Sequence, residues 1–366
     1  MDFPSLFRPG ILSTRPYSPG RPIEEVQREL GLRDVIKLAS NENPEGPLPE
    51  VLEAIRAAAE TGNRYPDASC WELTRALAAH LGVATEAILL GNGSNEVLDL
   101  LIRAAVSPGE NVVYAHPSFI VYRIATDVHF ETGRAVPLTA DDRHDLPAMA
   151  RAADARTKLV IVCNPNNPTG TYNTEAELRA LLAALPPRTL VAVDEAYCDY
   201  AVAADYPRSL ELQARHPNLV VLRTFSKIHS LAGLRVGYAV GHPDLIAQLQ
   251  KTREPFNVNS LAQAAALACL RRHDVVAQRA KRNREQLEWL AARCEALGLR
   301  VTPSQANFLL VRCPGAAAEL AQALLRRGVI VRPMAGWGLD EHALRISVGL
   351  PQENRRCIQA LEEILT

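Results

Sequence analysis

Four short motifs in the middle of the chain combine residue types that are able to bind a ligand and react with it. They are NPNNPTG (Asn164–Gly170), DEAY (Asp194–Tyr197), TFSK (Thr224–Lys227) and LAGLRVGY (Leu231–Tyr238). Taken singly, such motifs have plain explanations as a turn, the solvated end of a strand or a surface lysine. Each, however, follows a predicted buried strand, and ligands of open α/β sheets bind outside the carboxyl ends of the strands. The four motifs in this order therefore predict one ligand site.

A further segment, GNGSNE (Gly91–Glu96), lies between a predicted strand and a predicted helix. It is not a dinucleotide-binding fingerprint, because Glu96 stands where G-x-G-x-x-G requires the third glycine. We interpret it as a helix N-terminus. There the backbone N–H groups of Ser94 and Asn95 would bind a phosphate with help from the helix dipole.

Length and composition describe an ordinary globular protein. The chain has 366 residues, of which 48% are hydrophobic and 22% charged. This length exceeds what one compact core usually holds, so two lobes are expected. The formal net charge is −1 and the pI is about 6.8. No overall field would therefore attract nucleic acid or an anionic membrane.

Cysteine and histidine usage excludes two classes of protein. The seven cysteines are odd in number and contain no C-x-x-C pair, which argues against a disulfide framework and a structural zinc site. The nine histidines show no metal-ligand spacing, so no metal is expected. The first residues do not resemble a signal peptide, and no apolar run is long enough to span a bilayer. We expect a cytoplasmic protein.

Apolar runs alternate with helical patterns from Val35 onward. The predicted strands are Ala87–Gly91, Asn111–Ala115, Lys158–Cys163, Thr189–Ala196 and Asn218–Thr224, and the helices between them include Asn95–Val106, Thr174–Leu185 and Pro243–Lys251. Fully apolar strands that alternate with helices predict an α/β fold with a mostly parallel central sheet flanked by helices.

The last third of the chain has a different pattern, typical of a smaller α+β domain. Its predicted helices are Leu261–Leu270, Val275–Leu297, Ala316–Arg326 and Asn354–Leu365, and its predicted strands are Phe308–Val311, Val329–Arg332 and Ala343–Val348. We expect an N-terminal arm at 1–34 that packs with the small domain and carries a helix at Glu24–Leu30. A large ligand-binding domain at 35–257 and a small domain at 258–366 would follow.

In these motifs and their order the chain resembles the aspartate-aminotransferase-like enzymes of fold type I, class I and II, which depend on pyridoxal 5′-phosphate (PLP). The resemblance covers nearly the whole chain and implies that the large domain binds PLP. Three N-terminal segments, Arg15–Leu32, Leu38–Pro47 and Arg64–Asp67, resemble the histidinol-phosphate aminotransferases of histidine biosynthesis more specifically. This implies ping-pong transfer of an amino group between histidinol phosphate and 2-oxoglutarate, with glutamate as the product.

The resemblance assigns the catalytic residues. Lys227 would carry the cofactor as a Schiff base and then move the α-proton, which a lysine does best when desolvation and nearby positive charge lower its pKa. Asp194 ends an apolar strand, where an unpaired carboxylate is costly. In the family this aspartate pairs with the pyridine nitrogen of PLP and keeps it protonated. Asn167 and Tyr197 would hydrogen-bond the phenolic oxygen of the ring.

Other residues would hold the cofactor phosphate and the ring. Arg235 supplies a guanidinium fork and a positive charge, Thr224 and Ser226 supply hydroxyls, and Ser94 and Asn95 supply N–H groups. Phe119 would stack on the ring, although many relatives have tyrosine or tryptophan there; its alternative role is that of a core aromatic. Tyr65 in RYPD resembles the tyrosine that reaches the phosphate of the neighbouring subunit, which implies a homodimer with shared active sites.

The substrate end of the site rests on the second lobe and the arm. LRIS (Leu344–Ser347) implies that Arg345 binds the carboxylate of glutamate and 2-oxoglutarate. Arg332 and Tyr17 match ligands of the substrate phosphate, and Asn167 also faces the substrate. Charge-assisted hydrogen bonds are worth about 1.5–3 kcal/mol, so two of them would favour a phosphorylated amine by roughly 100-fold or more. His116 and His229 either touch the substrate or fill the wall of the site.

Three alternatives remain open. An aromatic amino-acid aminotransferase is compatible with Phe119 and the strip Ile120–Tyr122. A PLP-dependent decarboxylase of a phosphorylated amino acid would use the same catalytic set, but would release carbon dioxide and retain the α-amino nitrogen. An aminotransferase-like sensor domain of a transcription regulator would need a DNA-binding module, and no helix-turn-helix pattern precedes the fold.

Overall fold

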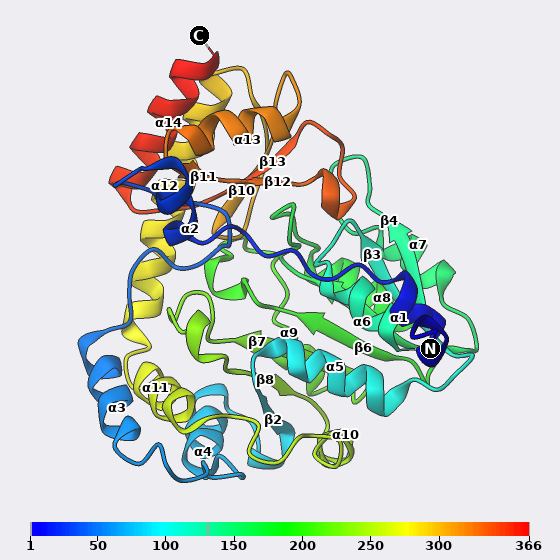
Figure 1. Cartoon of the computed structure of the whole chain (residues 1–366). Coiled ribbons are helices and arrows are strands. Elements are labelled where there is room, and N and C mark those ends of the chain that lie inside the picture. The colour runs from blue at the N-terminus through cyan, green and yellow to red at the C-terminus, as the bar shows by residue number, and fades with distance from the viewer. Residues whose placement is uncertain (1, 130–131, 366) are drawn as a thin grey trace.

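The computed structural model describes residues 2–129 and 132–365. Its centre is a seven-stranded sheet in the order β2-β8-β7-β6-β5-β3-β4 (Figure 1). The strands are β2 (Ile88–Gly91), β3 (Asn111–His116), β4 (Gly133–Pro137), β5 (Thr157–Cys163), β6 (Leu190–Asp194), β7 (Leu219–Thr224) and β8 (Gly237–Val240). All neighbouring strands from β4 to β7 pair in parallel, whereas β8 is antiparallel to β2 and β7. The predicted α/β fold with a mostly parallel sheet is confirmed.

Two strands of this sheet were not predicted from the sequence. β8 is only four residues long and directly follows the LAGLR segment. No α-helical pattern separates its apolar run GYAV from the preceding motif, so the sequence did not indicate a separate strand. β4 lies at the edge of the sheet, contains both glycine and proline, and has one buried residue among its five. Glycine and proline weaken a strand pattern and are tolerated mainly at edges.

Helices cover both faces of the sheet. Leu159 and Ile161 of β5 pack into the core formed with α5 (Ser94–Ala105), whereas the alternate residues Val160 and Val162 pack into the core formed with α8 (Glu175–Ala184). This alternation is the two-residue period of a strand buried on both sides. The helices of the large lobe are α3 (Pro49–Ala59), α4 (Trp71–Leu81), α5 (Ser94–Ala105), α6 (Val121–Val128), α7 (Leu146–Ala152), α8 (Glu175–Ala184), α9 (Ser209–Gln213) and α10 (Pro243–Leu249).

The small lobe is built on a four-stranded antiparallel sheet in the order β12-β13-β10-β9. Its strands are β9 (Arg300–Thr302), β10 (Phe308–Arg312), β12 (Arg332–Pro333) and β13 (Ala343–Ser347), and its helices are α12 (Asp274–Ala296), α13 (Ala317–Arg326) and α14 (Pro351–Leu365). The predicted single strand Val329–Arg332 is wrong. Its first part, β11 (Val329–Ile330), pairs in parallel with β1 (Ile36–Lys37), and only β12 joins the small sheet.

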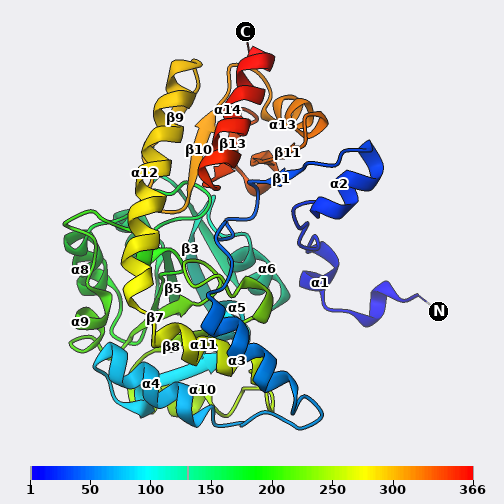
Figure 2. The same ribbon diagram turned by 90° about the vertical axis from the view of Figure 1, so that its left-hand side faces the viewer.

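The described part of the N-terminal arm contains the α-helices α1 (Pro9–Ser13) and α2 (Ile23–Leu30), which lie along one side of the molecule (Figure 2). Val26 of α2 is fully buried against Ala39, Leu325 and Ile330. α1 lies beside α6 of the large lobe. The domain boundaries stay a prediction; α11 (Ser260–Leu270), which follows the expected boundary at 257, packs against α3 and α4.

Short 3-10 helices connect several of these elements. They are η1 (Pro4–Leu6), η2 (Thr85–Ala87), η3 (Cys198–Tyr200), η4 (Ala232–Leu234) and η5 (Ala335–Trp337). The seven cysteines are free thiols. Over residues 2–129 and 132–365, no helix combines the length and the apolar character needed to cross a membrane.

Candidate active site

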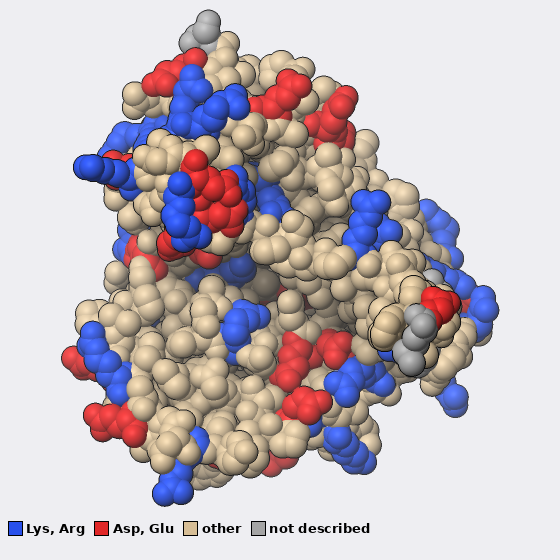
Figure 3. All heavy atoms as spheres, viewed as in Figure 1, with Lys and Arg blue, Asp and Glu red and all other residues tan. Residues whose placement is uncertain are grey.

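A cavity of about 200 Å³ lies where the carboxyl ends of β5, β6 and β7 face the small lobe. Figure 3 shows a hollow between the two lobes with basic side chains at its edge. Apart from Tyr65, His116 and His229, all predicted site residues line this cavity. Those on its wall are Tyr17, Ser94, Asn95, Phe119, Asn167, Asp194, Tyr197, Thr224, Ser226, Lys227, Arg235, Arg332 and Arg345. Residues that are up to 328 positions apart in sequence, Tyr17 and Arg345, are thereby brought to one site.

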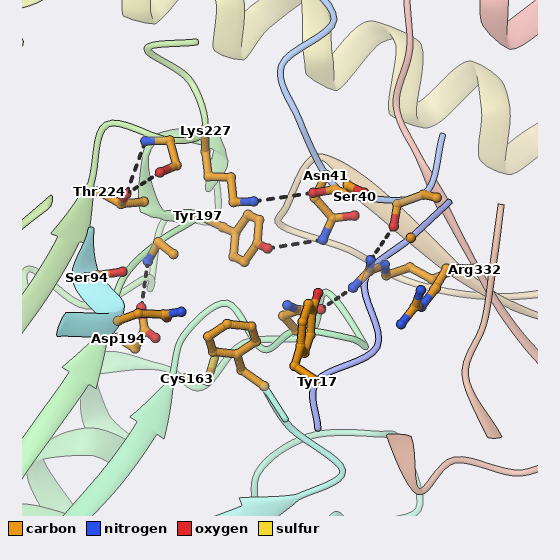
Figure 4. Close-up of a pocket in the computed structure, with 18 of the residues that line it drawn as sticks. Tyr17, Ser40, Asn41, Ser94, Cys163, Asp194, Tyr197, Thr224, Lys227 and Arg332 are labelled. Atoms are coloured by element: carbon orange, nitrogen blue, oxygen red, sulfur yellow. Dashed lines mark hydrogen bonds between the residues drawn. The ribbon is translucent and has the colours of Figure 1, made fainter. Parts of the chain in front are cut away.

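Lys227 points into the cavity from the loop after β7 (Figure 4). Its Nζ lies 3.5 Å from the backbone carbonyl of Ser40 and 5.4 Å from the centre of the Tyr197 ring. Desolvation, followed by the positive charges of Arg345 and Arg235, lowers the pKa of Lys227 to about 8. About a tenth of this amine is therefore unprotonated, and nucleophilic, at pH 7, which is far more than for an ordinary lysine.

Asp194 ends β6 at the other side of the cavity. Its Oδ2 accepts a hydrogen bond from the Tyr122 hydroxyl at 2.6 Å, and its Oδ1 accepts one from the backbone N–H of Ala196 at 3.2 Å. Burial raises the pKa of Asp194, while these two hydrogen bonds oppose the rise. A buried carboxylate of this kind is suited to a cationic partner.

An anion cradle lies at the N-terminus of α5. Gly93 precedes the helix with φ of 82°, and a Cβ atom there would lie 2.4 Å from Nη2 of Arg235. A Cβ atom on Gly237 would lie 2.4 Å from the backbone nitrogen of Ser94. Only glycine therefore fits at these two positions.

Hydroxyl groups complete the cradle. Nη1 of Arg235 donates to Oγ of Ser226 at 3.2 Å, and Oγ1 of Thr224 lies 3.0 Å from the same oxygen. A helix N-terminus, a guanidinium group and two hydroxyls together fit a phosphate group.

The middle of the cavity is lined by amide and phenol groups. The hydroxyl of Tyr197 accepts a hydrogen bond from Nδ2 of Asn41 at 3.1 Å, and burial raises the pKa of Tyr197. Oδ1 of Asn167 accepts a hydrogen bond from Nη1 of Arg345 at 2.5 Å. The NH₂ group of Asn167 remains available as a donor to a ligand.

Two arginines from neighbouring strands face the cavity from the small lobe. Arg345 donates from Nη2 to the carbonyl of Ala39 at 2.6 Å, and its buried Nε has no hydrogen-bond partner among residues 2–129 and 132–365. Burial lowers the pKa of Arg345 to about 10, so it remains charged at neutral pH. Arg332 pairs with Arg345 across β12 and β13 and donates to the carbonyl of Ser18 at 2.5 Å. An unpartnered buried donor on a charged group is what an anionic ligand would satisfy.

Three predicted contacts lie outside the cavity of this chain. The side chain of Tyr65 is 81% exposed and its ring stacks on Phe256 at 4.6 Å. The ring of His116 packs against Gly338, where an added Cβ would lie 2.3 Å from Nε2. The ring of His229 lies 4.8 Å from that of Phe225. Neither histidine lines the cavity.

Several residues that line the cavity or lie directly behind its wall were missed by the sequence analysis. Asn41 lies in the segment Leu38–Pro47 (LASNENPEGP), which was a usable signal. It has a positive φ of 54°, which asparagine tolerates better than most residues. Trp337, in the loop after β12, gave no sequence signal. Tyr122 was noted only as part of an apolar strip, and its contact with Asp194 joins residues 72 positions apart.

The cavity fits PLP. The anion cradle suits the cofactor phosphate, Lys227 suits its aldehyde, and Asp194 suits its ring nitrogen, while Phe119 lies on the wall as a stacking surface. Within the part of the chain that the structure describes, no group of three or more His, Cys, Asp or Glu side chains is placed to bind a metal ion.

Comparison with known proteins agrees with this geometry. The model of the family "Aminotransferase class I and II" matches residues 33–361. The histidinol-phosphate aminotransferase of Moorella thermoacetica is 48% identical over 98% of this chain and 92% of the relative. Histidinol-phosphate aminotransferase 2 of Pseudomonas aeruginosa is 48% identical over 100% of this chain and 99% of the relative.

A solved structure is similar over the same extent. The crystal structure of histidinol-phosphate aminotransferase from Sinorhizobium meliloti in complex with pyridoxal-5′-phosphate has a TM-score of 0.88 at 31% identity. It covers 99% of this chain and 98% of that one. This chain belongs to the class I and II aminotransferases, in the branch of the histidinol-phosphate aminotransferases.

Proposed function

We propose that this enzyme uses PLP to transfer the amino group of histidinol phosphate to 2-oxoglutarate, a step of histidine biosynthesis. The observation that carries the proposal is the joint placement of Lys227, with its lowered pKa, and the two arginines Arg332 and Arg345 in one cavity. The names of the relatives from Moorella thermoacetica and Pseudomonas aeruginosa supply the substrate.

The residues of the chain divide the work as follows. When bound, PLP supplies the electron sink that stabilises a carbanion at the α-carbon of the substrate. Lys227 would hold the cofactor through Nζ. Once the substrate has displaced it, the same nitrogen would take the α-proton of the substrate and later release it. Because the pKa of Lys227 is about 8, this amine is poised to accept and release a proton near neutral pH.

Asp194, Tyr197 and Arg235 act on the cofactor rather than on the substrate. The carboxylate of Asp194 would hold a proton on the ring nitrogen, since its own buried charge favours a cationic partner. Tyr197 and Asn167 would donate hydrogen bonds to the phenolic oxygen of the ring. Arg235, Ser226, Thr224 and the first N–H groups of α5 would hold the phosphate in a fixed orientation.

The two arginines would serve both substrates. Arg345, with its unpartnered Nε, would bind the α-carboxylate of glutamate and 2-oxoglutarate. Arg332 and Tyr17, which lie beside it on the wall toward the arm, would bind the phosphate of histidinol phosphate.

We also propose that the enzyme is a homodimer with shared active sites. Tyr65, although 81% exposed in the single chain, would donate to the cofactor phosphate bound by its partner. Exposed apolar side chains support a partner subunit, because large exposed apolar groups favour association. They include Phe3, Leu6 and Phe7 of the arm, Trp71 and Phe256. The proposal also includes a cytoplasmic location. It further includes a division of the chain into an arm at 1–34, a large domain at 35–257 and a small domain at 258–366.

Product analysis tests the proposed function. The PLP-loaded enzyme is incubated with histidinol phosphate and 2-oxoglutarate, and glutamate and carbon dioxide are measured. We expect glutamate to form in step with consumption of histidinol phosphate, without carbon dioxide. Release of carbon dioxide with retention of the amino nitrogen would instead identify a decarboxylase. Glutamate formation from phenylalanine but not from histidinol phosphate would identify an aromatic aminotransferase.

A further inference from the structure

Trp337 is held in a fixed place at the border of the active-site cavity. It is the last residue of η5, where its backbone N–H donates to the carbonyl of Met334 at 2.9 Å. Gly338, with φ of 93°, ends this turn and packs against His116 of the large lobe so closely that no Cβ atom would fit. The turn is therefore fixed to both lobes.

The indole ring of Trp337 lies near both substrate arginines. The Cζ atoms of Arg345 and Arg332 lie 5.5 Å and 5.8 Å from its ring centre, and the residue is only 7% exposed. A guanidinium within about 6 Å of an aromatic face is attracted by the ring quadrupole. The ring thus stabilises two positive charges that repel each other.

The two arginines depend on this ring to different degrees. Arg345 is also anchored by Asn167 and by the carbonyl of Ala39. Among the described residues, Arg332 has a single hydrogen bond, to the carbonyl of Ser18 on the arm. Removal of the indole should therefore displace Arg332 more than Arg345.

Trp337 also lines two cavities. Together with Tyr17, Gly20 and Arg332, it borders both the active-site cavity of about 200 Å³ and an outer cavity of about 940 Å³ between the arm, α6 and α13. It stands at the place where a substrate would pass from the outer to the inner cavity.

We propose that Trp337 is a specificity-determining residue that positions Arg332 for the phosphate of the amine substrate. The proposal rests on the proposed function above. It predicts a selective effect on the phosphorylated substrate, because 2-oxoglutarate uses Arg345, which keeps its other anchors.

Steady-state kinetics of Trp337→Leu with both substrates tests this. We expect KM for histidinol phosphate to rise about tenfold, the size of a partly desolvated cation–π contact, and KM for 2-oxoglutarate to change less than about threefold. Trp337→Phe, which keeps an aromatic face, should restore most of the wild-type KM. The matched control is Trp289→Leu, which removes another tryptophan with an arginine over its ring, Arg293 at 5.7 Å, on α12.

The outcomes separate this proposal from the proposed function. Equal losses with both substrates, or an unchanged KM for histidinol phosphate, would overturn the role of Trp337 alone. If the wild-type enzyme does not turn over histidinol phosphate, the proposed function fails. In that case, calorimetric binding of inorganic phosphate to the PLP-loaded protein tests the role of Trp337 independently of the substrate. Weaker phosphate binding in Trp337→Leu than in the wild type supports the role, and equal binding overturns it.

Discussion

The hydroxyl of Tyr122 donates a 2.6 Å hydrogen bond to Oδ2 of Asp194, although the two residues lie on different elements, α6 and β6. Tyr122 is fully buried behind the cavity wall. Since each carboxylate oxygen can accept about two hydrogen bonds, Asp194 is anchored by this bond and by Ala196 and still has acceptor capacity toward the cavity. Tyr122 is thus placed to fix the orientation and the charge of the proposed ring-nitrogen partner.

Tyr122→Phe should lower kcat about tenfold with both substrates, because a hydrogen bond to a charged group is worth about 1.5–3 kcal/mol and only part of it acts on the reaction. Without this donor the pKa of Asp194 rises further, and a proton stays more often on Asp194 than on the ring nitrogen. Steady-state kinetics and PLP affinity check this. The control is Tyr114→Phe, a buried tyrosine whose ring centre lies 6.5 Å from that of Tyr122. Equal effects of both variants would contradict the specific role of Tyr122.

Gly93→Ala should weaken PLP binding by about tenfold or more, because the added Cβ would meet Nη2 of Arg235 at 2.4 Å and distort the anion cradle. Titration of the cofactor-free protein with PLP measures this. Gly109→Ala is a matched control, since Gly109 has a similar φ of 87° but no atom within 4 Å of an added Cβ. The control should lose about 1 kcal/mol of stability from the strained backbone and bind PLP normally. Normal binding by Gly93→Ala would refute the cradle.

The rate at which cofactor-free protein captures PLP should rise with pH through about 8, because the unprotonated amine of Lys227 is the nucleophile and its pKa is lowered to about 8. Arg345→Gln should move this midpoint upward, since the positive charge of Arg345 is one cause of the lowered pKa. Stopped-flow absorbance at a series of pH values measures both midpoints. Arg300→Gln, an exposed change on β9, should leave the midpoint in place. An unshifted midpoint in Arg345→Gln would show that the two groups are not coupled.

His144 should make the folded protein sensitive to acid. Burial lowers the pKa of His144 from about 6.5 to about 4. Between these values the unfolded chain binds a proton that the folded chain does not, so stability is lost as the pH falls through this range, by at most about 3 kcal/mol. Urea unfolding at pH 7 and at pH 4.5 should show a smaller difference for His144→Leu than for the wild type. An unchanged difference would contradict the prediction.

The large lobe and the cofactor-facing residues could be predicted because their signals are local. Lys227 and Asn167 follow an apolar strand within a few residues, and Asp194 is the last residue of another. Parallel strands bring their carboxyl ends to one edge of the sheet. β8 was not predicted because this four-residue antiparallel strand is not preceded by a crossover helix, which would have indicated a new strand. β4 escaped because an edge strand needs few apolar residues.

Contacts between residues far apart in the sequence could not be predicted from the sequence. The Tyr122–Asp194 bond spans 72 positions and the bond of Arg345 to Asn167 spans 178. Residue type alone does not reveal such partners, because the pairing depends on how two separate elements dock. Trp337 is the clearest case, since its neighbours Tyr17, Arg332 and Arg345 come from the arm and from two strands of the small sheet.

The central claim is that amino-group transfer from histidinol phosphate occurs at Lys227. The most direct test is a single half-reaction, in which the absorbance of the lysine-bound cofactor is followed while the PLP-loaded enzyme is titrated with histidinol phosphate. We predict that the band is lost at stoichiometric substrate, returns on addition of 2-oxoglutarate, and is absent from Lys227→Ala, whose turnover falls by several orders of magnitude. The claim would be contradicted if the band responded to phenylalanine but not to histidinol phosphate. It would also be contradicted if the Lys227→Ala variant kept a turnover within about tenfold of the wild type.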